Sequence, residues 1–208
     1  HGAHGYILCQ FLSEEVNLRD DEYGGSFENR NRLLKEIIEG VRSECRDDFM
    51  LGVRISSERF GILLSESKAL AEDLMTSGDL DFLDMSLWDC FKEPQEEEFK
   101  GKTLIQHFCE LDRGTTRLGV AGNLRTPQDV TKAMEEGVDW IMLGRAAILH
   151  HNFPILYEEN DEFTPSQIPV SVDYLTEEGL SPKFIEYMSN WGFVDGSVDL
   201  MKEAIKKA

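Results

Sequence analysis

Residues 117–143 read RLGVAGNLRTPQDVTKAMEEGVDWIML and carry the clearest structural signal in the chain. The two apolar runs of this stretch, 117–121 and 139–143, are too short for buried helices, which predicts two buried strands. Between them, Pro127 suits the first position of a helix, and Gly137 ends that helix before the second strand. The stretch therefore predicts a strand, a helix and a parallel strand in succession.

The same alternation extends toward the N-terminus. Short runs rich in branched residues, at 49–55 and 81–87, predict two further strands. Apolar residues at the spacing of one helix face lie at 33–41 and 70–75 and predict amphipathic helices. Four βα units in a row indicate an α/β protein. The repeat fits both a doubly wound sheet and a (β/α)8 barrel, and its spacing alone favours neither.

Length and composition indicate one domain. The chain has 208 residues, of which 41% are hydrophobic, and no apolar run is long enough to span a membrane. We predict a single domain over residues 1–208, with the βα units in about residues 1–150. A C-terminal extension, punctuated by prolines, follows in residues 151–208 and ends in an amphipathic stretch, Val198–Lys207.

Charge and cysteine usage narrow the range of partners. The net charge of −19 disfavours nucleic acid and anionic membranes, because both require a contiguous basic surface. The four cysteines are far apart and have neither the spacing of a zinc site nor that of an iron–sulfur cluster. Their dispersed positions predict reduced thiols in a cytoplasmic protein and no metal site. The sequence shows no basic-then-apolar leader, so nothing in it is typical of a secretory signal. The cysteines are Cys9, Cys45, Cys90 and Cys109.

Two imidazoles and a phenol lie close together at the start of the sequence. His1, His4 and Tyr6 follow a point where a strand is expected, and barrel enzymes gather their catalytic groups at strand ends. Imidazole N–H groups can donate hydrogen bonds to a substrate oxygen, and a phenol can supply a proton. Two alternatives stay open. The histidines can be loop residues without a role, or they can bind a metal, although no carboxylate or thiolate lies at ligand spacing.

The first thirty residues carry a dense set of motifs, which are His1-Gly2-Ala3-His4-Gly5-Tyr6, Gln10-Phe11-Leu12, Asn17, Arg19, Asp21 and residues 23–30, YGGSFENR. Together they resemble the old yellow enzyme family of FMN-dependent ene reductases. The resemblance implies a (β/α)8 TIM barrel in which residues 1–6 leave the end of the fourth strand and the four predicted strands are the fifth to the eighth. A C-terminal helical extension then follows the barrel.

The resemblance also implies an activity. A family member takes hydride from NADH or NADPH onto FMN and passes it to an activated alkene such as an enone. His1 and His4 would bind the substrate oxygen, and Tyr6 would deliver the proton. Half a barrel exposes sheet edges, so we expect either a homo-oligomer or a missing N-terminal half as partner. The alternative is a noncatalytic half-barrel, or an assembly partner, that lacks a complete flavin site.

Cofactor-binding residues are expected after the strands. Arg54 is a charge near the end of an apolar strand and requires an anionic partner, either a ligand or a core acid such as Asp84. In the resembling family the matching arginine contacts FMN. The last two βα loops of a barrel commonly form a phosphate site, which the resemblance assigns here to the FMN phosphate. Its residues would be Gly122, Asn123, Gly144 and Arg145. Trp88 receives no role from the sequence.

Overall fold

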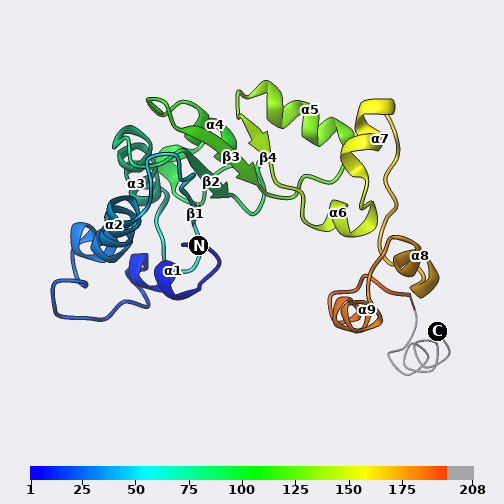
Figure 1. Ribbon diagram of the computed structural model, residues 1–208, viewed down its shortest axis with the longest axis horizontal. Coiled ribbons are helices and arrows are strands. Elements are labelled where there is room, and N and C mark those ends of the chain that lie inside the picture. Colours follow the sequence, from blue (N-terminus) through cyan, green and yellow to red (C-terminus); the bar gives the residue numbers. More distant parts are fainter. Residues whose placement is uncertain (196–208) are drawn as a thin grey trace. The chain divides into compact units, whose positions relative to one another are not determined.

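The computed structural model describes residues 1–195 and divides the chain into two compact units (Figure 1). The first unit comprises residues 1–123 and 132–142, and the second comprises residues 124–131 and the chain from residue 143 onward. The amphipathic stretch Val198–Lys207 lies outside the described residues. Each unit is described by itself.

The first unit is built on a parallel four-stranded sheet. Neighbours in the sheet follow one another in the sequence, with the order β1-β2-β3-β4 and every pair parallel. This confirms the α/β class and the four predicted strands, each of which lies in or overlaps its apolar run. The strands are β1 (Gly52–Ser56), β2 (Phe82–Ser86), β3 (Arg117–Ala121) and β4 (Trp140–Ile141).

Helices link the strands of this unit. In Figure 1, α3 lies beside the sheet, where it packs against β2, and α1 packs against α2. The hydroxyl of Ser26 caps α2 by accepting a 3.3 Å hydrogen bond from the amide of Asn29. The elements are α1 (Ile7–Leu12), α2 (Phe27–Glu44), α3 (Leu64–Thr76), the 3₁₀ turn η1 (Glu97–Phe99) and α4 (Leu104–Cys109).

The core of the sheet is apolar, and two glycines in it are required by packing. Ile55, Leu83 and Val120 are fully buried. A Cβ on Gly52 would collide with the ring of Phe82, and one on Gly119 with the ring of Trp140. These two rings meet edge to face with centroids 5.4 Å apart. Glycine on β1 and β3 thus accommodates the large rings on β2 and β4.

The predicted start of the helix after β3 is confirmed. This helix, α5 (Pro127–Glu135), is capped by Thr126, whose hydroxyl accepts a 3.1 Å hydrogen bond from the amide of Asp129. The carboxylate of Asp129 in turn accepts a 2.9 Å bond from the amide of Thr126. The reciprocal pair satisfies two amides that the first helical turn leaves without partners.

The second unit is helical over its described part beyond residue 143. Its hydrophobic core joins α6, α8 and α9 through residues such as Leu149, Leu175 and Ile185. A parallel bridge between Val170 and Val194 closes the segment that carries α8 and α9. The helices are α6 (Arg145–Leu149), α7 (Phe153–Glu159), α8 (Val172–Glu177) and α9 (Pro182–Ser189).

Candidate functional site

The start of the chain runs beside β1 as a neighbouring strand would. The amide of Gly2 donates a 2.6 Å hydrogen bond to the carbonyl of Arg54, and Gly2 forms a parallel bridge with Ile55. Residues 3–6 therefore follow at the carboxyl edge of the sheet, beside the end of β1. This is the edge at which parallel α/β proteins bind ligands.

The structure brings His1, His4 and Tyr6 together. The ring centroids of His1 and His4 are 5.2 Å apart, and those of His1 and Tyr6 are 5.5 Å apart. All three residues are exposed to solvent. Within residues 1–195 neither imidazole makes a hydrogen bond to another residue. The N–H groups of both rings are therefore available to a ligand.

His4 is held in a set orientation. Its φ of 61° is left-handed, and its amide donates a 3.1 Å hydrogen bond to the hydroxyl of Ser56 at the end of β1. Partial burial, together with the positive charge of Arg54, lowers the pKa of His4 below its ordinary value of 6.5. At neutral pH the ring is uncharged, so it offers one N–H as a hydrogen-bond donor and is not a strong acid.

Arg54 is partnered within the sheet. Its Nε donates a 2.7 Å hydrogen bond to the hydroxyl of Ser86 and lies 3.1 Å from Oδ2 of Asp84. The contact with Asp84 is the alternative that the sequence left open. Both contacts engage Nε, which leaves the two Nη groups as donors. A role for Arg54 in FMN binding stays a prediction.

Asp84 is a site residue that sequence analysis treated only as a partner for Arg54. Its side chain is 6% exposed, and Oδ1 has no hydrogen-bond partner among the described residues. Burial raises the pKa of Asp84 above its ordinary value of 3.8, and the charge of Arg54 offsets part of that rise. A buried carboxylate oxygen without a partner requires explanation and marks this part of the sheet as a polar site.

The loops that follow β2 and β3 are fastened to each other. Nδ2 of Asn123 donates a 3.1 Å hydrogen bond to Oδ2 of Asp89, and the amide of Cys90 donates one of 3.1 Å to the carbonyl of Gly122. A Cβ on Gly122 would lie 3.0 Å from the amide nitrogen of Asp89. Close approach of the β2 loop therefore explains the glycine at 122, independently of any ligand.

Backbone strain is concentrated at this edge. Non-glycine residues rarely adopt positive φ, and such residues often mark functional sites. The residues of this kind in the described chain all lie in the N-terminal loop or in the loops after β1, β2 and β3. They are His4 (61°), Arg59 (82°), Phe60 (58°), Trp88 (65°) and Asn123 (53°).

The second unit holds Gly144 and Arg145, at the start of α6. A cavity of about 370 Å³ is lined by Arg145, by Arg125 and by the hydroxyl residues Thr126 and Ser166, among others. Over residues 1–195 neither arginine forms an ion pair, although the chain has 40 acidic residues and 21 lysines and arginines. Arg125 was missed by sequence analysis. An arginine directly before a helix cap was the only available signal.

The expected phosphate cradle is divided between the units. Gly122 and Asn123 belong to the first unit, whereas Gly144 and Arg145 belong to the second. A Cβ on Gly144 would meet no atom within 4 Å, so the backbone there is open to close approach by a ligand. The joint action of the four residues as a cradle stays a prediction.

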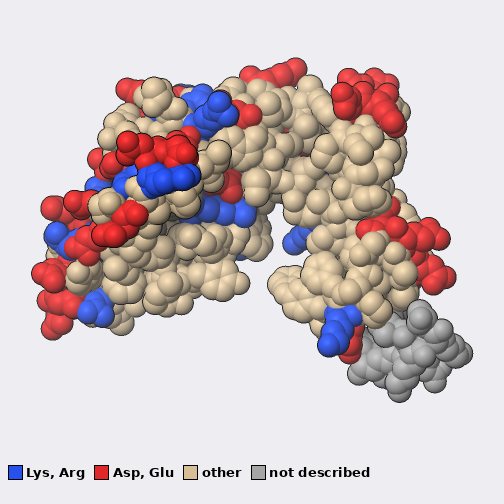
Figure 2. Space-filling model, in the orientation of Figure 1, with Lys and Arg blue, Asp and Glu red and all other residues tan. Residues whose placement is uncertain are grey.

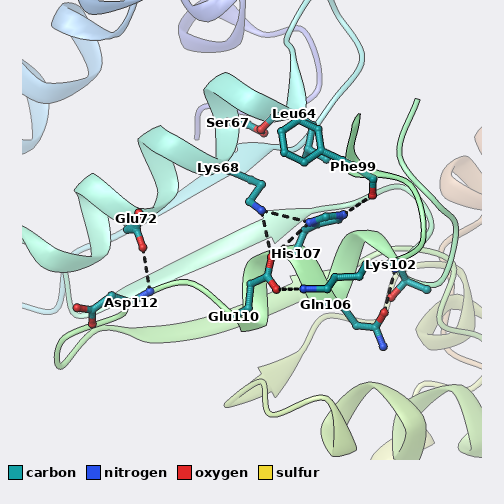
Figure 3. Close-up of polar contacts among 11 residues, drawn as sticks. Leu64, Ser67, Lys68, Glu72, Phe99, Lys102, Gln106, His107, Glu110 and Asp112 are labelled. Carbon is teal, nitrogen blue, oxygen red and sulfur yellow. Dashed lines mark hydrogen bonds and ion pairs between the residues drawn. The ribbon is translucent and has the colours of Figure 1, made fainter. Parts of the chain in front are cut away.

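A second polar cluster lies between α3 and α4 and is structural (Figure 3). Nζ of Lys68 lies 3.2 Å from Nδ1 of buried His107 and 3.2 Å from Oε1 of Glu110. Nε2 of His107 lies 2.7 Å from the carbonyl of Phe99. Glu110 also pairs with Lys102. These contacts fasten the two helices and the 3₁₀ turn.

Two further features are the distribution of surface charge and the residue types that could bind a metal. Acidic and basic side chains are interspersed on the face shown in Figure 2, and the acidic ones form several separate patches. Across residues 1–195, no group of three or more histidine, cysteine or acidic side chains is arranged to hold a metal ion. No helix in this part of the chain is long and apolar enough to cross a membrane.

Comparison with known proteins gives consistent matches. The model of the NADH:flavin oxidoreductase / NADH oxidase family matches residues 1–162. The NADH oxidase of Thermoanaerobacter brockii is 30% identical over 161 residues, which cover 74% of this chain and 25% of that protein. The chain thus spans about a quarter of this relative's length.

Two solved structures share the fold. The complex of 2-naphthoyl-CoA reductase with 2-naphthoyl-CoA has a TM-score of 0.61 and 25% identity, covering 76% of this chain and 25% of that one. Morphinone reductase in complex with tetrahydroNAD has a TM-score of 0.60 and 24% identity, covering 84% of this chain and 45% of that one. Both neighbours are TIM-barrel-like, and this chain shares with them an α/β fold with a parallel sheet.

Proposed function

Because the chain belongs to the NADH:flavin oxidoreductase / NADH oxidase family, we propose that it forms part of an FMN-dependent reductase of activated alkenes. Membership confirms the resemblance to the old yellow enzyme family, whose cofactors are FMN and NAD(P)H. The observation that carries the proposal is the cluster of His1, His4 and Tyr6 at the carboxyl edge of the sheet, with hydrogen-bonding groups free for a ligand.

The residues of this cluster have distinct tasks. FMN, when bound, takes hydride from NADH or NADPH and passes it to the alkene. His1 and His4 donate hydrogen bonds to the carbonyl oxygen of the substrate, which draws electrons from the double bond. The lowered pKa of His4 keeps that ring neutral, so it polarises the oxygen without protonating it. The phenol of Tyr6 supplies the proton to the α-carbon.

The donor set suits FMN. A phosphate favours arginine side chains and backbone amides, and Arg145 lies without a carboxylate partner beside the open backbone of Gly144. Arg54 keeps two Nη donors for the flavin. The residues that would hold the cofactor are Arg54, Gly122, Asn123, Gly144 and Arg145.

The proposal includes an architecture and a partner. The four strands would be the fifth to the eighth of a (β/α)8 barrel, and either a first half or a second copy of the chain would cover the open sheet. A noncatalytic half-barrel is the competing proposal. A cytoplasmic location remains a prediction from the dispersed cysteines.

Steady-state kinetics test the proposed function. With FMN present, oxidation of NADPH should depend on added 2-cyclohexenone. Replacing both His1 and His4 by alanine should lower kcat/KM for the enone at least about 100-fold, because the donors to the substrate oxygen are lost. Tyr6→Phe should lower turnover of the enone while the reduction of FMN by NADPH continues. A rate of NADPH oxidation that changes neither when the enone is added nor in the His1/His4 and Tyr6 variants would contradict the proposal.

A further inference from the structure

Arg59 and Trp88 form a stacked pair beside the candidate site. The guanidinium carbon of Arg59, in the loop after β1, lies 3.8 Å from the ring centroid of Trp88, in the loop after β2. Trp88 is 57% exposed, and Arg59 is exposed as well. A guanidinium that stacks on an indole face keeps its N–H groups pointing outward in its own plane, where they can bind a planar anion.

Arg59 lacks the partner expected of an arginine in so acidic a chain. In the described part of the chain its side chain forms neither an ion pair nor a hydrogen bond. Acidic residues outnumber basic ones by 40 to 21 in the whole sequence, and most arginines of the first unit do pair with carboxylates. The charge of Arg59 is therefore available to an external group.

The pair adjoins the substrate-binding cluster. Phe60, next to Arg59 in sequence, lies so close to Gly5 that a Cβ on Gly5 would be 3.2 Å from Cδ1 of the phenylalanine ring. Gly5 lies between His4 and Tyr6. The loop that carries Arg59 therefore borders the residues that would bind and protonate the substrate.

Both loops are fixed in strained conformations. Arg59 has a φ of 82° and Trp88 one of 65°. The carbonyl of Gly61 accepts a 3.0 Å hydrogen bond from the amide of Glu14, which anchors the first loop. Asp89 anchors the second by accepting a 3.0 Å bond from the amide of Phe91. A strained backbone that is held this firmly is typical of binding sites.

We propose that Arg59 and Trp88 bind a carboxylate on the substrate, so that the preferred alkenes are flat and carry an acidic group. This inference rests on the proposed function. The exposed indole supplies an apolar flat surface, and the stacked guanidinium supplies two parallel donors for the carboxylate. The carbonyl of the same substrate would then lie at His1 and His4.

Calorimetry with benzoate and benzamide tests the assignment without turnover. The two probes share a flat ring and differ in charge. The purified chain should bind benzoate up to about fivefold more tightly than benzamide, since an exposed ion pair is worth at most about that factor. Arg59→Gln should abolish the preference, Arg59→Lys should retain part of it, and Trp88→Ala should weaken both probes.

Arg117→Gln is the matched control. Arg117 is also exposed and lacks a side-chain partner among the described residues, but it begins β3 at the opposite edge of the sheet. This variant should keep the preference for benzoate. Equal binding of the two probes by the unaltered chain, or a preference that survives Arg59→Gln, would overturn the assignment. A rise in the KM for NADPH in Arg59→Gln, with the affinity for benzoate unchanged, would also overturn the assignment. That result would indicate a site for a dinucleotide phosphate.

The proposed reductase activity and the proposed carboxylate site can be contradicted independently of each other. Selective binding of benzoate that depends on Arg59, in a chain that does not reduce enones, would contradict the proposed reductase and leave the carboxylate site in place. Reduction of enones with no discrimination between the probes would contradict the carboxylate site alone.

Discussion

The amide of Gly2 donates a 2.6 Å hydrogen bond to the carbonyl of Arg54. This bond joins the N-terminal motif to the first strand of the sheet and sets the position of residues 3–6. His4 then reaches the hydroxyl of Ser56, and Arg54 is close enough to His4 to influence its protonation. Residues 52 positions apart in the sequence thus make one site.

The first prediction concerns Ser56, which accepts the amide of His4. Ser56→Ala leaves that amide without its partner and should destabilise the fold by about 1 kcal/mol, as a lost hydrogen bond typically does. Urea denaturation measures the loss, and kcat/KM for an enone should fall because His4 is no longer held. Ser65→Ala is the control, since it removes the hydrogen bond from the hydroxyl of Ser65, on α3, to Glu96 and leaves His4 untouched. Equal effects on the enone from both variants would refute the positioning role of Ser56.

A second prediction follows from the charge beside His4. An NMR titration of the His4 ring should show a pKa below 6.5, and Arg54→Gln should raise it because the positive charge is removed. The folded-state pKa lies below the unfolded value, so His4 contributes stability above about pH 6.5 that is lost as the pH falls. Arg54→Lys keeps the charge and serves as the control. A His4 pKa that does not change in Arg54→Gln would show that burial alone sets it.

The third prediction concerns Cys109. Burial raises the pKa of this thiol to about 11, from an ordinary value of 9.0. Only the thiolate reacts with iodoacetamide, so at pH 8 the folded chain should be alkylated at Cys109 about 100-fold more slowly than the chain unfolded in urea. Mass spectrometry of peptides from timed samples measures the two rates. Similar rates in both states would mean that Cys109 is not protected in the native protein.

A fourth prediction concerns acid stability. The hydrogen bond from Lys102, supported by Lys68, lowers the pKa of Glu110 to about 2 from an ordinary 4.5. The contribution of Glu110 is therefore present above pH 4.5 and is lost as the pH falls toward 2. In Glu110→Gln the free energy of unfolding should depend less on pH between pH 4.5 and 2 than it does in the unaltered chain. Glu98→Gln, at an exposed glutamate with no ion pair among the described residues, should leave that dependence unchanged.

The strands and the helix start were predictable because their signals are local. The apolar run at 117–121 is a strand with those bounds, and the next helix starts at Pro127 as predicted, capped by Thr126 and Asp129. The last strand is shorter than the run 139–143, although the amide of Met142 still donates to the carbonyl of Val120. Apolar periodicity locates a strand but does not fix where its pairing ends.

The site was predictable only in part. The motif at residues 1–6 identified His1, His4 and Tyr6, which the fold brings together. The Arg59–Trp88 stack could not be predicted from the sequence, because it depends on two left-handed backbones at residues other than glycine. The orphaned oxygen of Asp84 could not be predicted either, since the partners of a buried carboxylate are set by tertiary packing.

The central proposal is that this chain forms part of an FMN-dependent reductase, and a flavin spectrum of the purified chain tests it most directly. After FMN is added and excess cofactor removed, we predict a retained band near roughly 450 nm that NADPH bleaches and an enone restores. Arg145→Ala should lose the band. Retained flavin that the enone fails to reoxidise, or flavin that Arg145→Ala retains as well as the unaltered chain does, would contradict the claim.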